Sequence, residues 1–360
     1  MAGSKSSHGG RWRRAAQRHA AAIRFRCAVG SRQGRGRVAL GAALVVTLAA
    51  CSAGAGGPDA PPPSSADRAV AVTGPRAYLY LVSPAGGAAR QLLSRAEADR
   101  LVSVSAPAWS PDGKLIAFTA GCPSCTPRLY VVSSTGTGLR MIPTGPGGVS
   151  SPSWAPDGTA IVVTRQRGEQ QFIVAVHLRT GGVWLVNGEP ADADNFDSTP
   201  AWSPDGKSIV FAREIHHEDV TLWVVPALGG KPRPLIRRDT AFEQSHPQWS
   251  PDGRRVVFIQ SVLPSVTWDL FVFNRATRTV TQLTKDATNE YDPAWSPDGK
   301  SIVFAGDVAS RAGFRSLYVI GADGSGLRRI TASTTDDDSM PAWSPDGSAI
   351  IFVRRPIIKS

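Results

Sequence analysis

The stretch Pro293-Ala-Trp-Ser-Pro-Asp-Gly-Lys-Ser-Ile-Val-Phe304 occurs six times along the chain in closely similar form. The other five copies begin at Pro107, Pro152, Pro200, Pro247 and Pro341. The tryptophans of successive copies are 45, 48, 47, 46 and 48 residues apart. A near-constant period in the forties indicates that one supersecondary unit is repeated along the chain.

Each repeat is predicted to contain four antiparallel strands. In Ser-Pro-Asp-Gly, proline fixes φ for a turn and glycine accepts the left-handed conformation that follows, so the segment predicts a tight turn between two strands. A third apolar run, such as Leu222–Val225, and a weaker fourth one, such as Val280–Leu283, come next. Four antiparallel strands per repeat are typical of a β-propeller blade. On this interpretation the repeated Trp packs between blades and the repeated Asp forms the turn.

The two ends of the chain are expected to complete one blade together. A first strand pair, 78–82 and 89–93, precedes any Trp motif, whereas the last Trp-containing pair, 343–353, has no strand pair after it. Placing the two pairs side by side removes two exposed sheet edges, which would otherwise promote aggregation. The sequence therefore predicts an all-β, six-bladed β-propeller whose N-terminal strands close the last blade.

The motif and its period resemble the TolB-type propeller repeat, a relative of the Trp-Asp propellers. The resemblance covers 76–354 and rests on six Trp-(Ser/Ala)-Pro-Asp-Gly copies. TolB itself carries an additional α/β domain ahead of its propeller. Here the propeller follows a linker almost directly, so the resemblance does not imply the envelope partners of the Tol system.

Positive charge is concentrated in the first 50 residues, which contain ten of the 40 basic residues and no acidic one. From Cys51 onward 30 basic residues face 29 acidic ones, so the rest of the chain is nearly neutral. The formal net charge of +11 therefore describes the N-terminal segment and gives no support for nucleic-acid binding.

The N-terminal segment has the features of a lipoprotein signal. Residues 38–50 form an uncharged run of the length of a signal-peptide core, ending in Leu48-Ala-Ala-Cys51. This ending resembles the bacterial lipobox, which implies that Cys51 is lipidated and anchors the chain outside the cytoplasm, in the cell envelope. An uncleaved anchor and a secretory signal with an incidental Cys are the alternatives. We expect a leader and signal peptide (1–50), a flexible Pro/Ser/Gly linker (51–70) and a propeller (71–356).

Acidic residues cluster in three of the loops that precede the Trp-containing strands, and strand alternation places these loops on one face of the ring. Such a face would steer a basic protein or peptide, although ordinary loop solvation explains the composition as well. The predicted binding face comprises Asp192, Asp194, Asp197, His216, His217, His246, Glu290, Asp292, Asp336, Asp337 and Asp338.

Two other features carry possible chemistry. Cys122 and Cys125 form a single Cys-x-x-Cys, which predicts a local disulfide in an oxidising compartment; a metal site is the alternative, but no second pair completes a four-ligand set. The residue four before each Trp is Ser in five repeats and Tyr in the sixth, which indicates either a polar ring near the channel or hydrogen bonds within each blade.

The sequence shows neither the Gly-x-Ser-x-Gly of a hydrolase nucleophile nor a Gly-rich phosphate loop. We therefore expect a monomeric, non-enzymatic module that binds an unknown protein or peptide, for which the acidic loops favour a basic partner, without a cofactor, a bound metal or nucleic acid. The alternative is a metal-assisted carbohydrate lyase or hydrolase at the propeller mouth, which would use His216, His217 and His246 with nearby carboxylates.

Overall fold

The computed structural model describes residues 76–121, 126–187, 195–215, 219–236, 242–262, 267–285, 288–308, 311–333 and 335–357. The chain divides into two units, Met1–Arg68 and Ala69–Ser360, and every described residue belongs to the second. The predicted signal peptide, the lipidation site Cys51, the linker and the pair Cys122 and Cys125 lie outside the described residues. Within these ranges, no helix has both the length and the apolar character needed to cross a membrane.

The described strands pair into five sheets, four of which contain four strands each. Their strand orders are β2-β1-β24-β23, β3-β4-β5-β6, β15-β16-β17-β18 and β19-β20-β21-β22. The bounds are β1 (Tyr78–Val82), β2 (Arg90–Gln91), β3 (Val102–Trp109), β4 (Leu115–Gly121), β5 (Arg128–Ser133), β6 (Arg140–Ile142), β15 (Gln244–Trp249), β16 (Arg255–Val262), β17 (Thr267–Asn274), β18 (Val280–Gln282), β19 (Glu290–Trp295), β20 (Ser301–Val308), β21 (Arg311–Gly321), β22 (Arg328–Arg329), β23 (Asp336–Trp343) and β24 (Ile350–Pro356). A short helix, α2 (Arg95–Ala98), follows β2.

The fifth sheet has eight strands, which form two antiparallel units of four. The first unit contains β7 (Gly148–Trp154), β8 (Ala160–Arg167), β9 (Gln170–His177) and β10 (Val183–Leu185); the second contains β11 (Asn195–Trp202), β12 (Ser208–Ile215), β13 (Asp219–Pro226) and β14 (Arg233–Pro234). A parallel pairing of Phe196 with Gln171 joins the two units. Divided there, this sheet repeats the four-stranded pattern of the other four.

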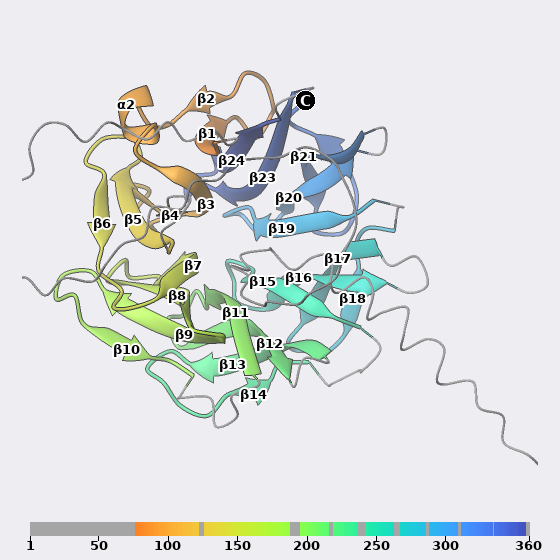
Figure 1. The fold of residues 1–360 in the computed structure, drawn as a ribbon. Coiled ribbons are helices and arrows are strands. Elements are labelled where there is room, and N and C mark those ends of the chain that lie inside the picture. Colours follow the sequence, from red (N-terminus) through yellow and green to blue (C-terminus); the bar gives the residue numbers. More distant parts are fainter. Residues whose placement is uncertain are drawn as a thin grey trace, which may run out of the picture. The chain divides into compact units, whose positions relative to one another are not determined.

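The first strand of every unit carries the repeated Trp, and these strands contact one another in a closed cycle. The cycle runs from β3 to β7, β11, β15, β19 and β23 and back to β3. Figure 1 shows these strands facing a common centre, with the later strands of each unit farther out. The arrangement is that of a propeller, and it places the Trp-containing strands around the axis.

The expected closure between the chain ends is confirmed. Strand β1 pairs antiparallel with β24, with Tyr78 opposite Arg354 and Val82 opposite Ile350. Strand β2 pairs in turn with β1, so the N-terminal strands are the outer half of a sheet whose inner half is C-terminal. This pairing satisfies the backbone groups of two edges that would otherwise be exposed.

The core lies between neighbouring units and includes the repeated Trp side chains. Trp154 on β7 packs among buried residues of the preceding unit, including Leu129, and its Nε1 donates a 3.0 Å hydrogen bond to the carbonyl oxygen of Ala108. Trp295 makes the same kind of bond to Gln248, at 3.3 Å. The indoles therefore join successive units, as the six-fold repetition predicted.

The repeated Asp forms the turn, also as predicted. Ser110 Oγ donates to Asp112 at 2.7 Å, and the same carboxylate oxygen accepts the backbone N–H of Lys114 at 3.1 Å. These hydrogen bonds lower the pKa of Asp112, with that from Ser110 contributing most. Asp346 has equivalent bonds from Ser344 and Ser348, and its pKa falls to about 2.

Candidate functional site: the pocket on the propeller axis

The centre of the ring contains a pocket of about 390 Å³. Residues from the first strand of every unit line it, so it lies on the axis around which the repeats are arranged. Most of the residues that line it are the Pro and Trp of the repeated motif, and polar atoms are exposed among them. A pocket of this size and composition is in the range that binds small molecules or single side chains of a partner.

A backbone irregularity is repeated at the same position of all six first strands. The pairing of each first strand with the second is interrupted after the residue four positions before the Trp and resumes with the residue just before it. The residue three positions before the Trp has a positive φ in every repeat: Ala106, Ser151, Thr199, His246, Asp292 and Met340, with φ from 48 to 54°.

The proline that follows explains this bulge. Proline has no backbone N–H and cannot donate to the ladder, and it disfavours the right-handed helical region for the residue before it. The left-handed conformation at that residue is uncommon for side chains other than glycine, and most of all for a β-branched residue such as Thr199. The bulge interrupts the ladder where the first strand passes the axis, and all six residues line the pocket.

These six pocket residues are the variable position of an otherwise regular repeat. The following residue is Pro in every copy, and the preceding one is Ser in all but one. The residue between them differs in every repeat. Positions that fold each unit are expected to repeat, whereas a site for an asymmetric ligand on the axis requires different side chains from different units. Comparison of the copies thus offers the sequence signal for this ring, next to the Ser or Tyr position that the repeat pattern also indicates.

One half of the ring carries the polar contacts. His246 Nε2 lies 3.3 Å from Asp292 Oδ1, and the backbone N–H of Met340 donates to Asp292 Oδ2 at 3.2 Å. Met340 Sδ accepts the backbone N–H of Ala106 at 3.1 Å. The opposite half presents the small side chains of Ala106, Ser151 and Thr199. The pocket is therefore asymmetric, because the side chains that make these polar contacts lie on the first strands from β15 to β23.

The charge of the pocket comes from one residue. Asp292 is its only carboxylate, and neither Lys nor Arg is among the described residues that line it. Its side chain is 16% exposed, against 40% for the neighbouring His246. A partly buried carboxylate among Pro and Trp is suited to hold a cationic group attached to an apolar stem.

A Ser-His-Asp order of hydrogen bonds is present beside the pocket. Ser245 Oγ lies 3.1 Å from His246 Nδ1, and the other ring nitrogen faces Asp292. Ser245 is on β15, in the ladder with Ile259, and is not among the residues that line the pocket. The hydroxyl is therefore not placed to act as a nucleophile on a molecule in the pocket, and its contact with Nδ1 orients His246.

The structure places several residues of the predicted acidic face beneath the surface. Asp197, Glu290, Asp337 and Asp338 are each 5% exposed or less. Arg213 binds Asp197 through two hydrogen bonds of 2.6 and 2.7 Å, and Asn187 donates to the same carboxylate. Glu290 accepts from the hydroxyl of Thr284 at 2.7 Å. These carboxylates already have partners within the protein.

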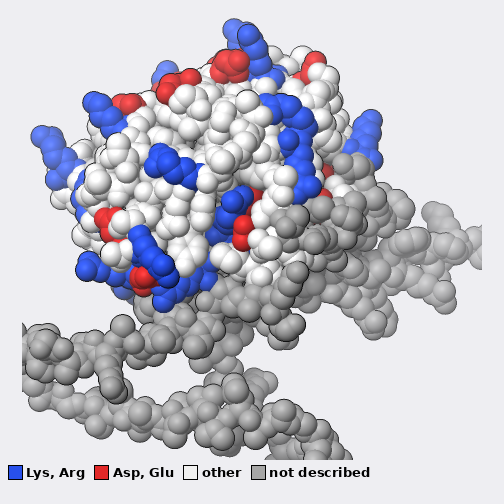
Figure 2. All heavy atoms as spheres, turned by 90° about the horizontal axis from the view of Figure 1, so that it is seen from above, with Lys and Arg blue, Asp and Glu red and all other residues white. Residues whose placement is uncertain are grey.

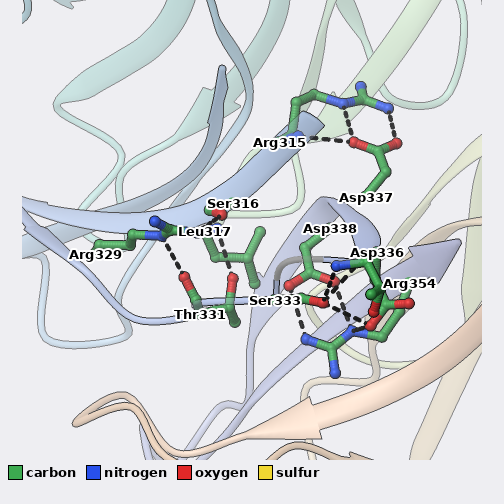
Figure 3. Close-up of polar contacts among 11 residues, drawn as sticks. Arg315, Ser316, Leu317, Arg329, Thr331, Ser333, Asp336, Asp337, Asp338 and Arg354 are labelled. Atoms are coloured by element: carbon green, nitrogen blue, oxygen red, sulfur yellow. Dashed lines mark hydrogen bonds and ion pairs between the residues drawn. The ribbon is translucent and has the colours of Figure 1, made fainter. Parts of the chain in front are cut away.

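Asp337 and Asp338 are bound by two different arginines (Figure 3). Arg354, from the same unit, holds Asp338 at 2.7 and 2.8 Å, and this pairing is the main reason that the pKa of Arg354 is raised. Arg315, from the neighbouring unit, holds Asp337 at 2.5 and 2.9 Å. Burial alone would lower the pKa of Arg315, but the hydrogen bonds and charge of Asp337 outweigh it, and the pKa is raised.

The remaining residues of the predicted face fall into two groups. Asp192, Asp194, His216 and His217 lie outside the described residues. Asp336 is half-buried, accepts from Ser333 Oγ at 2.7 Å and lies 3.7 Å from Arg354 (Figure 3). Of the eleven residues, the structure therefore brings His246 and Asp292 together in the axial pocket.

Sequence reasoning overlooked the arginines that neutralise these acids, because they come from second and third strands and not from the loops. Figure 2 views the ring at a right angle to Figure 1, and the side seen there carries both signs of charge, with Lys and Arg spread over it and Asp and Glu between them. The polar position four before each Trp serves within its blade at Ser105, whose Oγ lies 2.8 Å from Thr119 Oγ1. Within the described ranges, no cluster of three or more His, Cys, Asp or Glu is arranged to hold a metal ion.

Comparison with known proteins agrees with this architecture. The family model of the TolB β-propeller domain matches residues 56–246 and 240–357. A solved structure from Agrobacterium tumefaciens, described as a TolB, is 20% identical, with a TM-score of 0.64 over 79% of this chain and 100% of that one. TolB from Acinetobacter baumannii is also 20% identical, with a TM-score of 0.61 over 75% of this chain and 66% of that one.

An enzyme has a related fold. The oligogalacturonate lyase of Vibrio parahaemolyticus is 12% identical, with a TM-score of 0.52 over 78% of this chain and 97% of that one. At such identities these likenesses show the fold alone, and no curated protein matches the chain. The family model covers most of the chain, and the repeats, the strand pairing and the closed ring agree with it: this protein belongs to the TolB β-propeller family.

Proposed function

We propose that this protein is a binding module whose axial pocket takes a segment of a partner protein or peptide. The observation that carries the proposal is the ring of six side chains, each different, that the repeated bulges direct to one pocket. Six equal residues around the axis would give a ligand no preferred orientation within the ring. Six unequal residues define one orientation for a ligand.

The pocket favours a basic side chain of the partner. The aliphatic stem of a Lys or Arg packs well against Pro and Trp surfaces, while its charged end needs a carboxylate. Asp292 supplies that carboxylate, and His246 and the Met340 N–H hold it in place. Truncating a charged hydrogen-bond partner of this kind typically costs about 1.5–3 kcal/mol of binding.

The proposed location is outside the cytoplasm, in the cell envelope, with the chain anchored through lipid on Cys51. It rests on the uncharged run 38–50, the ending Leu48-Ala-Ala-Cys51 and membership of the TolB propeller family. A lipid of more than one acyl chain gives stable anchoring, which a single chain does not. Labelling with a fatty-acid probe should mark the wild type and not Cys51→Ala; equal labelling would contradict lipidation.

Site-specific photocrosslinking tests the binding proposal. A benzophenone amino acid replaces Ser151 in the pocket, and in a matched variant it replaces Leu228, which is 90% exposed on the turn between β13 and β14. We expect a discrete protein adduct from the Ser151 position in intact cells, identified by mass spectrometry. Absence of an adduct there, or the same adduct from Leu228, would contradict use of the pocket.

A second candidate function, a metal-assisted carbohydrate lyase, is favoured by two observations: the fold likeness to oligogalacturonate lyase and the position of His246 beside Asp292 in the pocket. Imidazole and carboxylate are both ligands of divalent metals. Metal analysis of the purified protein separates the candidates: a stoichiometric divalent metal that Asp292→Asn abolishes supports the enzyme. Peptide binding that persists in a chelator supports the binding module.

A further inference from the structure

A second hollow, of about 370 Å³, lies on the outer part of the β7–β10 unit. It is lined by Arg165 and Arg167 from β8, Gln170 and Phe172 from β9, Trp184 from β10, and Pro146 from the segment that links β6 to β7. Two guanidinium groups and two aromatic rings thus border one space. The axial pocket is lined by other residues, so the two sites are separate.

The strand register explains why the polar groups gather there. Arg165 pairs with Phe172 across the β8–β9 ladder, and Arg167 pairs with Gln170. Cross-strand partners point to the same face of a sheet, as do residues two apart on one strand. All four side chains therefore share one face of the unit, at the end where β8 and β9 meet.

Arg165 has no carboxylate partner among the described residues. Its Cζ lies 5.9 Å from the centre of the Phe172 ring, and one terminal nitrogen donates to the carbonyl oxygen of Thr144. Its Nε is buried without a hydrogen bond. Burial and the charge of Arg167 together lower the pKa of Arg165, so its surroundings disfavour the charged form.

Other repeats show what this position normally contacts. Arg165 stands eleven residues after its Trp, as do Arg213 and Arg354. Each of those two binds the residue five before its own Trp, Asp197 and Asp338 respectively, through two hydrogen bonds. The register also places Arg165 opposite the residue five before Trp154, but that residue is Val149. The β7–β10 unit therefore has the arginine of the other two units but lacks the carboxylate that pairs with it there.

We infer that this hollow beside Arg165 binds a small molecule that carries both a carboxylate and an apolar ring. The guanidinium of Arg165 would take the carboxylate through its terminal nitrogens, with Arg167 adding positive charge at the opening. Phe172 and Trp184 would contact the ring. Arginine is suited to this role because its fork of donors matches a carboxylate and it remains charged when partly buried.

The test uses isothermal titration of the purified full chain at low ionic strength with benzoate, benzyl alcohol and phenyl phosphate. We expect saturable binding of benzoate, at least tenfold weaker binding of benzyl alcohol, and at least tenfold weaker benzoate binding by Arg165→Gln. A higher affinity for phenyl phosphate than for benzoate would overturn the assignment to carboxylates. No saturable benzoate binding by the wild type, or equal binding by Arg165→Gln, would overturn the site itself.

Val149→Asp is the matched variant, since it restores the carboxylate that the other two repeats carry. The new side chain should pair with Arg165 and abolish benzoate binding. Unaltered benzoate binding in a folded Val149→Asp protein would contradict the inference. If this variant does not fold, Arg167→Gln decides instead: it should weaken benzoate binding severalfold, and an unchanged affinity would count against the site.

Discussion

His246 Nε2 and Asp292 Oδ1 lie 3.3 Å apart, although 46 residues separate them in the chain. They occupy the same repeat position on β15 and β19, and in both the backbone has a positive φ. Two neighbouring repeats thus contribute a basic and an acidic group to one point of the axial pocket. This pair is the starting point for a test of ligand binding.

Asp292→Asn should weaken binding of basic peptides without unfolding the protein. The change removes the one carboxylate found among the described residues that line the pocket, but keeps an oxygen that accepts the Met340 N–H. Loss of a charge-assisted hydrogen bond predicts an affinity reduced about 10- to 100-fold. Fluorescence polarisation with labelled peptides that carry Lys, Gln or Glu at their centre measures it. Asp336→Asn, outside the pocket, is the control, and equal losses in both variants would contradict the prediction.

Thr199→Gly should be stabilising by about 0.5–2 kcal/mol, because relief of left-handed strain exceeds the entropic cost of glycine. Thr199 is β-branched and has a φ of 49°. Urea denaturation of the variant and the wild type measures the difference in the free energy of unfolding. Ser198→Gly, next to it in the ladder and without a positive φ, should be destabilising. Destabilisation by both changes would show that the bulge holds no strain.

Asp197→Ala should lower the free energy of unfolding by about 3–5 kcal/mol, because it leaves the buried Arg213 without its partner. Asp197 is 1% exposed and receives two hydrogen bonds from Arg213. The double variant Asp197→Leu with Arg213→Met should recover most of the loss, since it removes both charges and fills the space. A double variant no more stable than the single one would contradict this account.

The turn carboxylates predict how stability depends on acid. Hydrogen bonds lower the folded-state pKa of Asp346 from 3.8 to about 2. An acid with a depressed pKa contributes stability above its unfolded pKa and loses it as pH falls through the folded value. The loss should therefore occur between about pH 4 and pH 2. Urea titrations across this range should show a shallower decline for Asp346→Asn, and an identical slope would contradict the prediction.

The N-terminal strand should unfold together with the rest of the ring. Leu79 on β1 is 1% exposed and packs in one cluster with Val353 of β24. Leu79→Ala should lower the free energy of unfolding by about 2–5 kcal/mol within a single transition. Urea denaturation followed by circular dichroism and by tryptophan fluorescence tests it. A separate early transition would show that closure by β1 is not part of the cooperative unit.

The sequence by itself determined the repeat and the way the chain closes. Ser-Pro-Asp-Gly encodes its turn through local φ preferences, and the continuous apolar runs beside it have the length and composition of buried strands. The strand pairs at 78–93 and 343–353 each lacked the other half of a four-stranded unit. The pairing of Leu79 with Val353 shows that they form one sheet together. These features depend on neighbours in the chain or on pattern matching, so they can be recognised without coordinates.

Only the tertiary structure decided which charged groups meet. The acidic loops suggested an exposed face, but Arg213, Arg315 and Arg354 on other strands bind Asp197, Asp337 and Asp338. Likewise the arrangement of the units around one axis brings the residues three before each Trp together in the pocket. Ion pairing and side-chain direction depend on strand register and on the neighbouring unit. Residues tens of positions apart settle both, and no local preference of the chain encodes them.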